Sequence, residues 1–96
     1  MSPKNKKKLN IQRKKLDILD KKLLNIIKTR TQIIKKVISL KTNRKEIVDK
    51  KRITFILRKI KKASIKKKID PTITLKIWKN MIWAYIDFER KNFKGK

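Results

Sequence analysis

The chain has 96 residues, enough for one small domain, and 32 Lys and Arg against seven Asp and Glu give it a formal net charge of +25. Because it has neither Cys nor His, disulfides, thiolate zinc sites, iron–sulfur clusters and imidazole catalysis are excluded. The single glycine, Gly95, rules out a glycine-rich phosphate loop. No apolar run approaches the roughly 20 residues of a membrane span, and the basic start at residues 1–8 is not followed by the apolar segment that a signal peptide needs, so we expect a cytoplasmic protein.

The first predicted helix runs from about Leu9 to about Lys41, preceded by a basic flexible tail at residues 1–8. Positions spaced alternately four and three apart form one stripe along it: Leu9, Arg13, Leu16, Asp20, Leu23, Ile27, Arg30, Ile34, Val37 and Lys41. At ~1.5 Å per residue the helix would be roughly 50 Å long, too long for this chain to cover alone. We therefore expect the stripe to be buried against a second copy, in an intertwined homodimer.

Four members of this stripe are charged, although burying an unpaired charge costs several kcal/mol. Arg13, Arg30 and Lys41 therefore indicate either a bound anion or positions at the edge of the stripe that reach water. Arginine suits two-point binding of a carboxylate or phosphate. The alternative, which composition alone favours, is that Arg13 and Arg30 pair with acids such as Asp17 or Asp20.

The distances along the helix show which of these cations can bind the same small molecule. Arg13 and Arg30 are 17 positions apart, or roughly 25 Å, too far to bind one small anion within one chain. Arg30 and Lys41 are 11 positions apart, about 16 Å, and can bracket a small molecule. In an antiparallel dimer, Arg13 of one chain can approach this segment of the other. The geometry predicts a shared site for a small dianion.

Two shorter helices are predicted after a polar loop at residues 42–48. Asp49 is expected to cap a second helix that ends near Lys62, and its inward face comprises Ile53, Ile56, Leu57 and Ile60. After a basic linker, Asp70 followed by Pro71 starts a third helix that ends near Asn92. The sequence thus predicts an all-α, three-helix chain with one helical domain at 9–93 and a C-terminal tail at 94–96.

The third helix carries one anomalous acid on its aromatic stripe. Trp78, Ile82, Tyr85 and Glu89 share this stripe, and we expect Trp78, Trp83, Tyr85 and Phe88 to lie in the core. Glu89 either lies inside with the aromatic residues or is solvated at a fraying helix end, paired with a nearby lysine. The pattern alone leaves both possibilities open.

Motifs along all three helices occur in a recognisable order: Arg13, LDILDKKLL at 16–24, Arg30, Lys41, Asp49 with Arg52, and IDPTITLKIWKNMIWAYIDFE at 69–89. This ordered set resembles the all-helical chorismate mutases from about Asn10 to Lys91. The resemblance implies an isomerase that converts chorismate to prephenate, in phenylalanine and tyrosine biosynthesis, by a Claisen rearrangement without metal or organic cofactor. Catalysis would come from holding the substrate in its reactive conformation and from stabilising the charge that separates across the breaking C–O bond.

The resemblance also implies roles for individual residues. Arg13 from the partner subunit and Arg30 would bind the two substrate carboxylates, while Lys41 would contact the ether oxygen and a carboxylate. Asp49 would lie by the ring hydroxyl, and Arg52 would support the carboxylate and the loop.

Two positions depart from the family pattern. Ile53 stands where many members have a Glu that binds the ring hydroxyl. Glu89 stands where the family often has a Gln that donates to the ether oxygen, and only a protonated carboxyl can donate that bond. Glu89, Arg30 and Lys41 are the expected catalytic residues, with Tyr85 as a further substrate-binding residue.

Two alternative functions stay open. The isochorismate-pyruvate lyases share the fold and the Arg, Arg and Lys positions, also lack the Glu after the loop Arg, and have a stretch similar to Trp83–Ile86. The mutase is favoured because Asp49 fits its pattern and because prephenate synthesis is needed more widely than salicylate synthesis. The third possibility is a small, basic, helical nucleic-acid-binding protein, whose binding would fall steeply with salt. The expected partners are thus chorismate and a second copy, with no membrane and only weak, nonspecific nucleic-acid binding.

Overall fold

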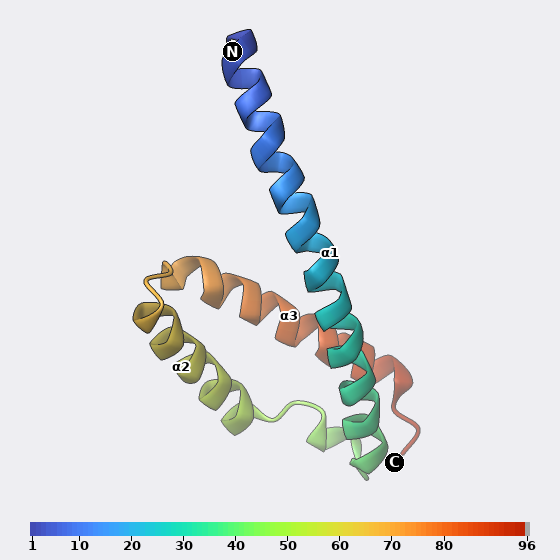
Figure 1. The fold of residues 1–96 in the computed structure, drawn as a ribbon. Coiled ribbons are helices and arrows are strands. Elements are labelled where there is room, and N and C mark those ends of the chain that lie inside the picture. Colours follow the sequence, from blue (N-terminus) through green and yellow to red (C-terminus); the bar gives the residue numbers. More distant parts are fainter. Residues whose placement is uncertain (96) are drawn as a thin grey trace. The chain divides into compact units, whose positions relative to one another are not determined.

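The computed structural model describes residues 1–95, and these residues form helices and connecting turns without a strand. The elements are α1 (Pro3–Leu40), the short 3-10 helix η1 (Arg44–Glu46), α2 (Lys50–Lys66) and α3 (Pro71–Asn92) (Figure 1). The all-α, three-helix prediction is therefore confirmed. The chain divides into two compact units, Met1–Ile33 and a second that begins at Ile34. Among the described residues, no helix combines the length and the apolar character of a membrane span.

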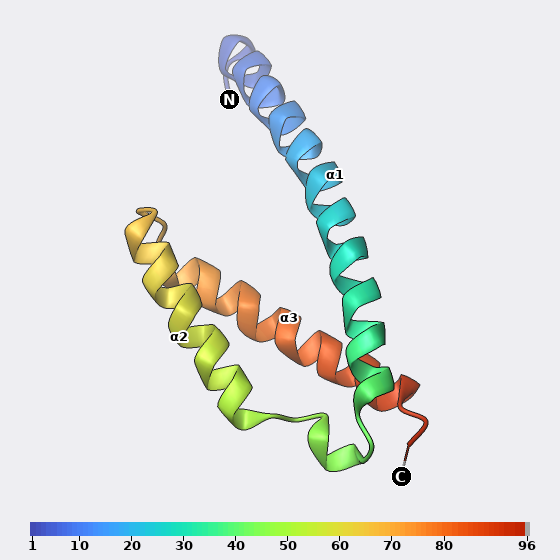
Figure 2. The same ribbon diagram turned by 60° about the horizontal axis from the view of Figure 1, so that its bottom comes forward.

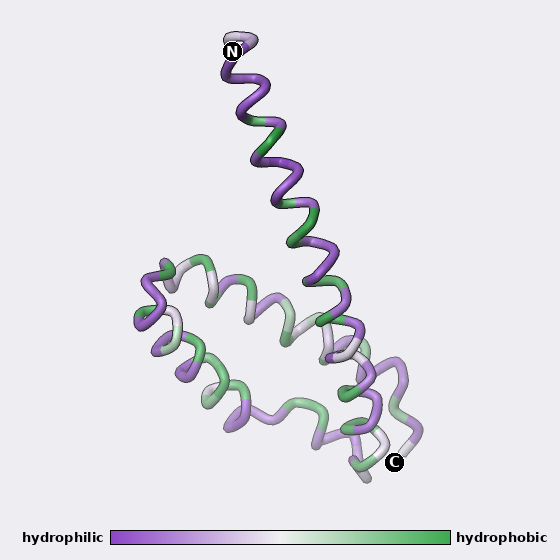
Figure 3. The backbone as a smooth tube through the Cα atoms, viewed as in Figure 1, coloured by the Kyte–Doolittle hydropathy of each residue, from purple (hydrophilic) through white to green (hydrophobic). Residues whose placement is uncertain are grey.

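The first unit is the N-terminal part of α1, which begins earlier than the predicted Leu9. The Ser2 hydroxyl accepts a hydrogen bond from the Asn5 amide (3.2 Å), and Pro3 occupies the first turn. Ser2 and Pro3 are thus a cap followed by proline, the same start signal as Asp70 and Pro71. The segment expected as a basic tail is helical from Pro3 onward, and Figure 3 shows apolar positions recurring along the helix between polar ones.

In the second unit, α2 and α3 pack side by side as a helical hairpin, seen from two directions in Figures 1 and 2. Asp49 caps α2 by accepting a hydrogen bond from the Arg52 amide (3.0 Å), and Asp70 caps α3 through the Thr72 amide (2.9 Å). Both predicted caps are confirmed. The predicted end of α3 at Asn92 is confirmed as well.

The C-terminal end of α2 lies at Lys66, beyond the predicted Lys62. The helix closes through a Schellman motif, in which the Ile69 amide donates to the Ser64 carbonyl (2.9 Å) and the Lys68 amide to the Ile65 carbonyl (3.1 Å). Lys68 has a φ of 59°, a left-handed conformation that glycine usually supplies. With lysine at that position, the sequence carries no stop signal there.

The core of the second unit is a small apolar cluster: Ile38, Ile47, Ile82, Ile86 and Phe93. The predicted inward residues of α2 are half-buried, and Ile53, Ile56 and Leu57 pack against this cluster. Ile47 was missed because it lies in the segment at residues 42–48, which was predicted to be a polar loop. On α1, Ile38 is buried, whereas Val37 of the predicted stripe stays 36% exposed.

One aromatic prediction is wrong. Trp83 is 49% exposed, because the face of α3 that meets the core carries Ile82, Ile86 and Glu89, and Trp83 lies off that face. Trp78 and Tyr85 are half-buried, and Phe88 packs against the core cluster. The predicted tail at 94–96 is described as far as Gly95, and Lys96 lies outside the described residues.

Candidate active site

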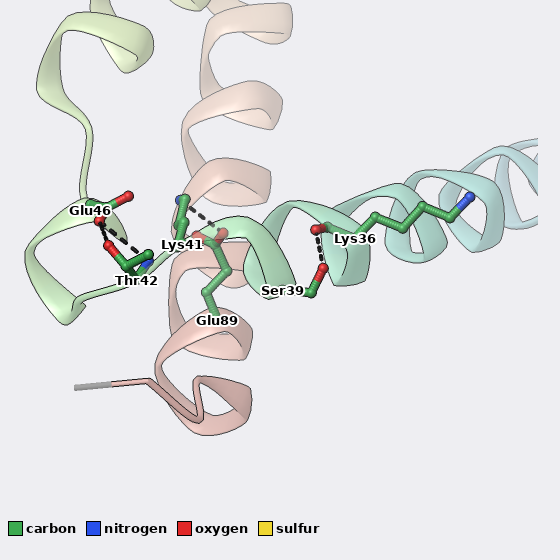
Figure 4. Close-up of polar contacts among 6 residues, drawn as sticks. All are labelled: Lys36, Ser39, Lys41, Thr42, Glu46 and Glu89. Atoms are coloured by element: carbon green, nitrogen blue, oxygen red, sulfur yellow. Dashed lines mark hydrogen bonds and ion pairs between the residues drawn. The ribbon is translucent and has the colours of Figure 1, made fainter.

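A buried ion pair joins two of the predicted catalytic residues. The Lys41 ammonium donates to Glu89 Oε1 over 3.1 Å, with side-chain exposures of 18% for Lys41 and 7% for Glu89 (Figure 4). Lys41 follows directly on the last residue of α1, and Glu89 lies in the last turns of α3. Because α3 continues to Asn92, the helix end does not fray at Glu89. Of the two possibilities left by the sequence, the structure places Glu89 inside.

The turn that follows Lys41 is held by a single carboxylate oxygen. Glu46 Oε1 accepts hydrogen bonds from the Thr42 hydroxyl (2.7 Å), the Thr42 amide (3.3 Å) and the Asn43 amide (3.3 Å). The Asn43 side chain in return accepts from the Lys45 amide (3.0 Å) and from the Glu46 amide, and the bond from Glu46 completes a capping box around η1. Sequence reasoning missed Glu46, although the Asn43–Glu46 spacing is that of a capping box and could have identified it.

Hydrogen bonding in this turn also lowers the pKa of Glu46. The hydrogen bond from the Thr42 side chain is the main reason that the pKa of Glu46 lies below its ordinary value of 4.5, and the charge of Lys41 lowers it further. At neutral pH Glu46 is therefore a carboxylate. It lies on the other side of Lys41 from Glu89 in Figure 4.

A cavity of about 510 Å³, largely open to solvent, has both Lys41 and Asp49 in its lining. Its other lining residues come from the same short stretch: Lys45, Glu46, Val48, Lys50 and Lys51. The volume falls within the range of small-molecule sites, and lysines outnumber acids in the lining. An excess of positive charge in a concave site attracts anions. The cavity is therefore suited to a small, negatively charged ligand.

The remaining predicted residues of the second unit have different surroundings. Arg52 is exposed, and its guanidinium lies over the Phe55 ring at 5.4 Å from the centroid. Ile53, at the position where many related enzymes have Glu, is half-buried and packs against the core. Tyr85 is half-buried on α3, one turn before Glu89.

Arg13 and Arg30 belong to the first unit, where Arg13 is exposed and Arg30 half-buried. That these arginines join Lys41 and Glu89 at one substrate stays a prediction. No group of three or more potential metal ligands lies together within residues 1–95.

The second unit thus combines an ion pair between a half-buried lysine and a buried carboxylate with a basic cavity whose lining includes that lysine. A sequence profile of the family described as chorismate mutase type II matches residues 12–90, and the chain belongs to this family. Neither the curated proteins nor the solved structures gave a match. Family membership implies an isomerase-type enzyme with chorismate as its substrate.

Proposed function

We propose that the protein is a chorismate mutase, which converts chorismate to prephenate by a Claisen rearrangement in phenylalanine and tyrosine biosynthesis. The observation that supports this most strongly is the Lys41–Glu89 pair. Both residues were expected at the ether oxygen from the family resemblance, and their side-chain atoms meet at 3.1 Å although they are 48 positions apart in the sequence.

In this proposal the protein acts without forming a covalent bond to the substrate. Chorismate carries two carboxylates, for which Arg30 and Arg13 of a second copy supply guanidinium groups. Lys41 donates to the ether oxygen, where negative charge develops as the C–O bond breaks, and to a carboxylate. A cation that is already in place for the developing charge lowers the barrier, because little reorganisation is needed during the reaction.

Glu89 supplies the second hydrogen bond to the ether oxygen. As a carboxylate it accepts from Lys41, but it must be protonated to donate to the substrate. The donor role proposed for Glu89 thus requires its protonated form, so the proposal predicts an activity that falls as pH rises.

The homodimer is part of the proposal because the apolar stripe of α1 is largely uncovered within one chain. Leu16 is 57% exposed, Leu23 52% and Ile27 37%. Covering these side chains with the same stripe of a second copy removes apolar area from water, which is the main driving force for association. The dimer would also supply Arg13 to the other chain's site.

A lyase that releases pyruvate from isochorismate is the second candidate. Ile53 favours it, because an apolar residue packed on the core replaces the Glu that many mutases use for the ring hydroxyl. Release of pyruvate from isochorismate, and none of prephenate from chorismate, would identify the lyase.

To test the proposed function, we compare the rates at which two variants turn over chorismate. Lys41→Met removes the proposed catalytic ammonium, and Lys59→Met is the control, because it makes the same change at an exposed position of α2. Removing an electrostatic donor to the transition state lowers kcat by about 100-fold or more, so Lys41→Met should lose that much while Lys59→Met keeps the wild-type rate. Equal activity in the two variants would refute the role of Lys41.

A further inference from the structure

We propose that Glu46 is a positioning residue for Lys41: its carboxylate closes the turn after Lys41 and thereby sets where the Lys41 ammonium lies. The catalytic part of this inference rests on the proposed function. Its structural part, the placement of Lys41 beside Glu89, can be tested without turnover.

The hydrogen bonds of Glu46 begin at the residue next to Lys41. The last helical bond of α1 in this region joins the Lys41 amide to the Ile38 carbonyl (3.2 Å). The following two amides, of Thr42 and Asn43, both donate to Glu46 Oε1. One side-chain oxygen therefore determines the path of the backbone as it leaves Lys41.

The same turn is also hydrogen-bonded to the end of α3, the helix that carries Glu89. Arg44 of η1 donates through Nη1 to the Arg90 carbonyl (3.3 Å), and its guanidinium lies 5.7 Å from the centroid of the buried Phe93 ring. The turn thus joins Lys41 on one side to the neighbour of Glu89 on the other. A change in its shape alters the distance between the two catalytic groups.

The negative charge of Glu46 also attracts the Lys41 ammonium. Glu46 and Lys41 line the same cavity, and Figure 4 shows Lys41 between the Glu46–Thr42 contact and Glu89. A lysine side chain has four rotatable bonds and no fixed direction of its own. Its ammonium is bonded to Glu89, and the charge of Glu46 adds a second attraction that favours this placement over extension into solvent.

The kinetic test compares Glu46→Ala, Glu46→Gln and the control Asp87→Asn. The Gln side chain keeps an oxygen that accepts from both amides, whereas Ala removes it. Asp87→Asn makes the same change in charge as Glu46→Gln at an exposed site of α3.

At a temperature where all variants are folded, Glu46→Ala should lower kcat about tenfold or more with a smaller change in KM, because misplacing a catalytic group by about 1 Å costs this much. Glu46→Gln should recover most of that loss, and Asp87→Asn should match the wild type.

The structural test uses nuclear Overhauser contacts between the Lys41 ε-methylene and the Glu89 γ-methylene. We expect them in the wild type and in Glu46→Gln, and their loss in Glu46→Ala with the rest of the spectrum preserved. Wild-type contacts in Glu46→Ala, or a Gln variant as impaired as the Ala variant, would overturn the inference. If the wild type turns over neither chorismate nor isochorismate, the proposed function fails, and the contacts alone decide the role of Glu46.

Discussion

Glu89 is almost fully buried beside Lys41, in a chain with only seven acids to 32 basic residues. A buried carboxylate requires a partner, and here the partner is a half-buried lysine at 3.1 Å. The sequence could show that Glu89 lay on an aromatic stripe, but its surroundings depend on how α3 packs with the end of α1. Periodicity within one helix carries no information about that contact.

The substitution Glu89→Gln should make catalysis independent of pH. The amide keeps a donor at every pH, whereas Glu89 donates only while protonated. The wild type should therefore lose kcat/KM as pH rises, while the variant keeps a flat profile and exceeds the wild type at the alkaline end.

Steady-state profiles from pH 5 to 9 measure this difference, with Asp87→Asn as a control that should follow the wild type. A flat wild-type profile, or a Glu89→Ala variant with full activity, would contradict the role given to Glu89.

At the scale of elements, helix starts were predictable and one helix end was not. Asp49 and Asp70 are helix-capping residues, and Pro71 follows Asp70 in the first turn. Both helix starts could therefore be identified from neighbouring residues alone. Ser2 before Pro3 has the same chemistry but was attributed to a basic tail. The end of α2 depends on Lys68 in a left-handed conformation, which lysine does not favour, so the residue type gives no signal for it.

Replacing Lys68 with Gly should stabilise the hairpin of α2 and α3. Glycine adopts the observed φ of 59° without the Cβ clash, and the gain should be up to about 1 kcal/mol in the free energy of unfolding. Chemical denaturation measures it, with Lys67→Gly as the control, which should not stabilise because Lys67 has a φ of −87°. A Lys68→Gly variant less stable than the wild type would contradict this assignment.

A hydroxyl pair between α2 and α3 should contribute to the same hairpin. Ser64 is 4% exposed, donates to the Ile60 carbonyl (2.6 Å) and shares a hydrogen bond with the Thr74 hydroxyl (2.6 Å). Ser64→Ala should cost about 1 to 2 kcal/mol, because Thr74 loses a buried partner. The exposed Ser39, which bonds only to the Lys36 carbonyl of its own helix, provides the control. Equal unfolding midpoints for Ser64→Ala and Ser39→Ala would show that the pair contributes nothing.

At the scale of the whole molecule, one chain leaves a long apolar stripe of α1 largely exposed. That stripe, the all-α fold and the ordered motifs could be read from the sequence because they are periodic or local. The capping box of Glu46 and the burial of Ile47 lay in a segment treated as a polar loop, where no periodicity reveals which side chains turn inward.

The dimer should depend on the exposed stripe of α1. Leu23→Asp places a charge where apolar contact is expected, so the variant should sediment as a monomer and lose turnover, because Arg13 of the second copy is absent from its site. Lys21→Asp, on the opposite face of the helix, should stay dimeric and active. A wild type that is monomeric at its working concentration and fully active would contradict both the dimer and the shared site.

The proposed function requires this chain to rearrange chorismate. The most direct measurement is product analysis after incubating the purified wild-type protein with chorismate and, separately, with isochorismate. We predict saturable formation of prephenate from chorismate, lost in Arg30→Ala and retained in the control Arg58→Ala, a change at an exposed arginine of α2. Pyruvate from isochorismate without prephenate from chorismate would contradict the mutase function and identify the lyase instead.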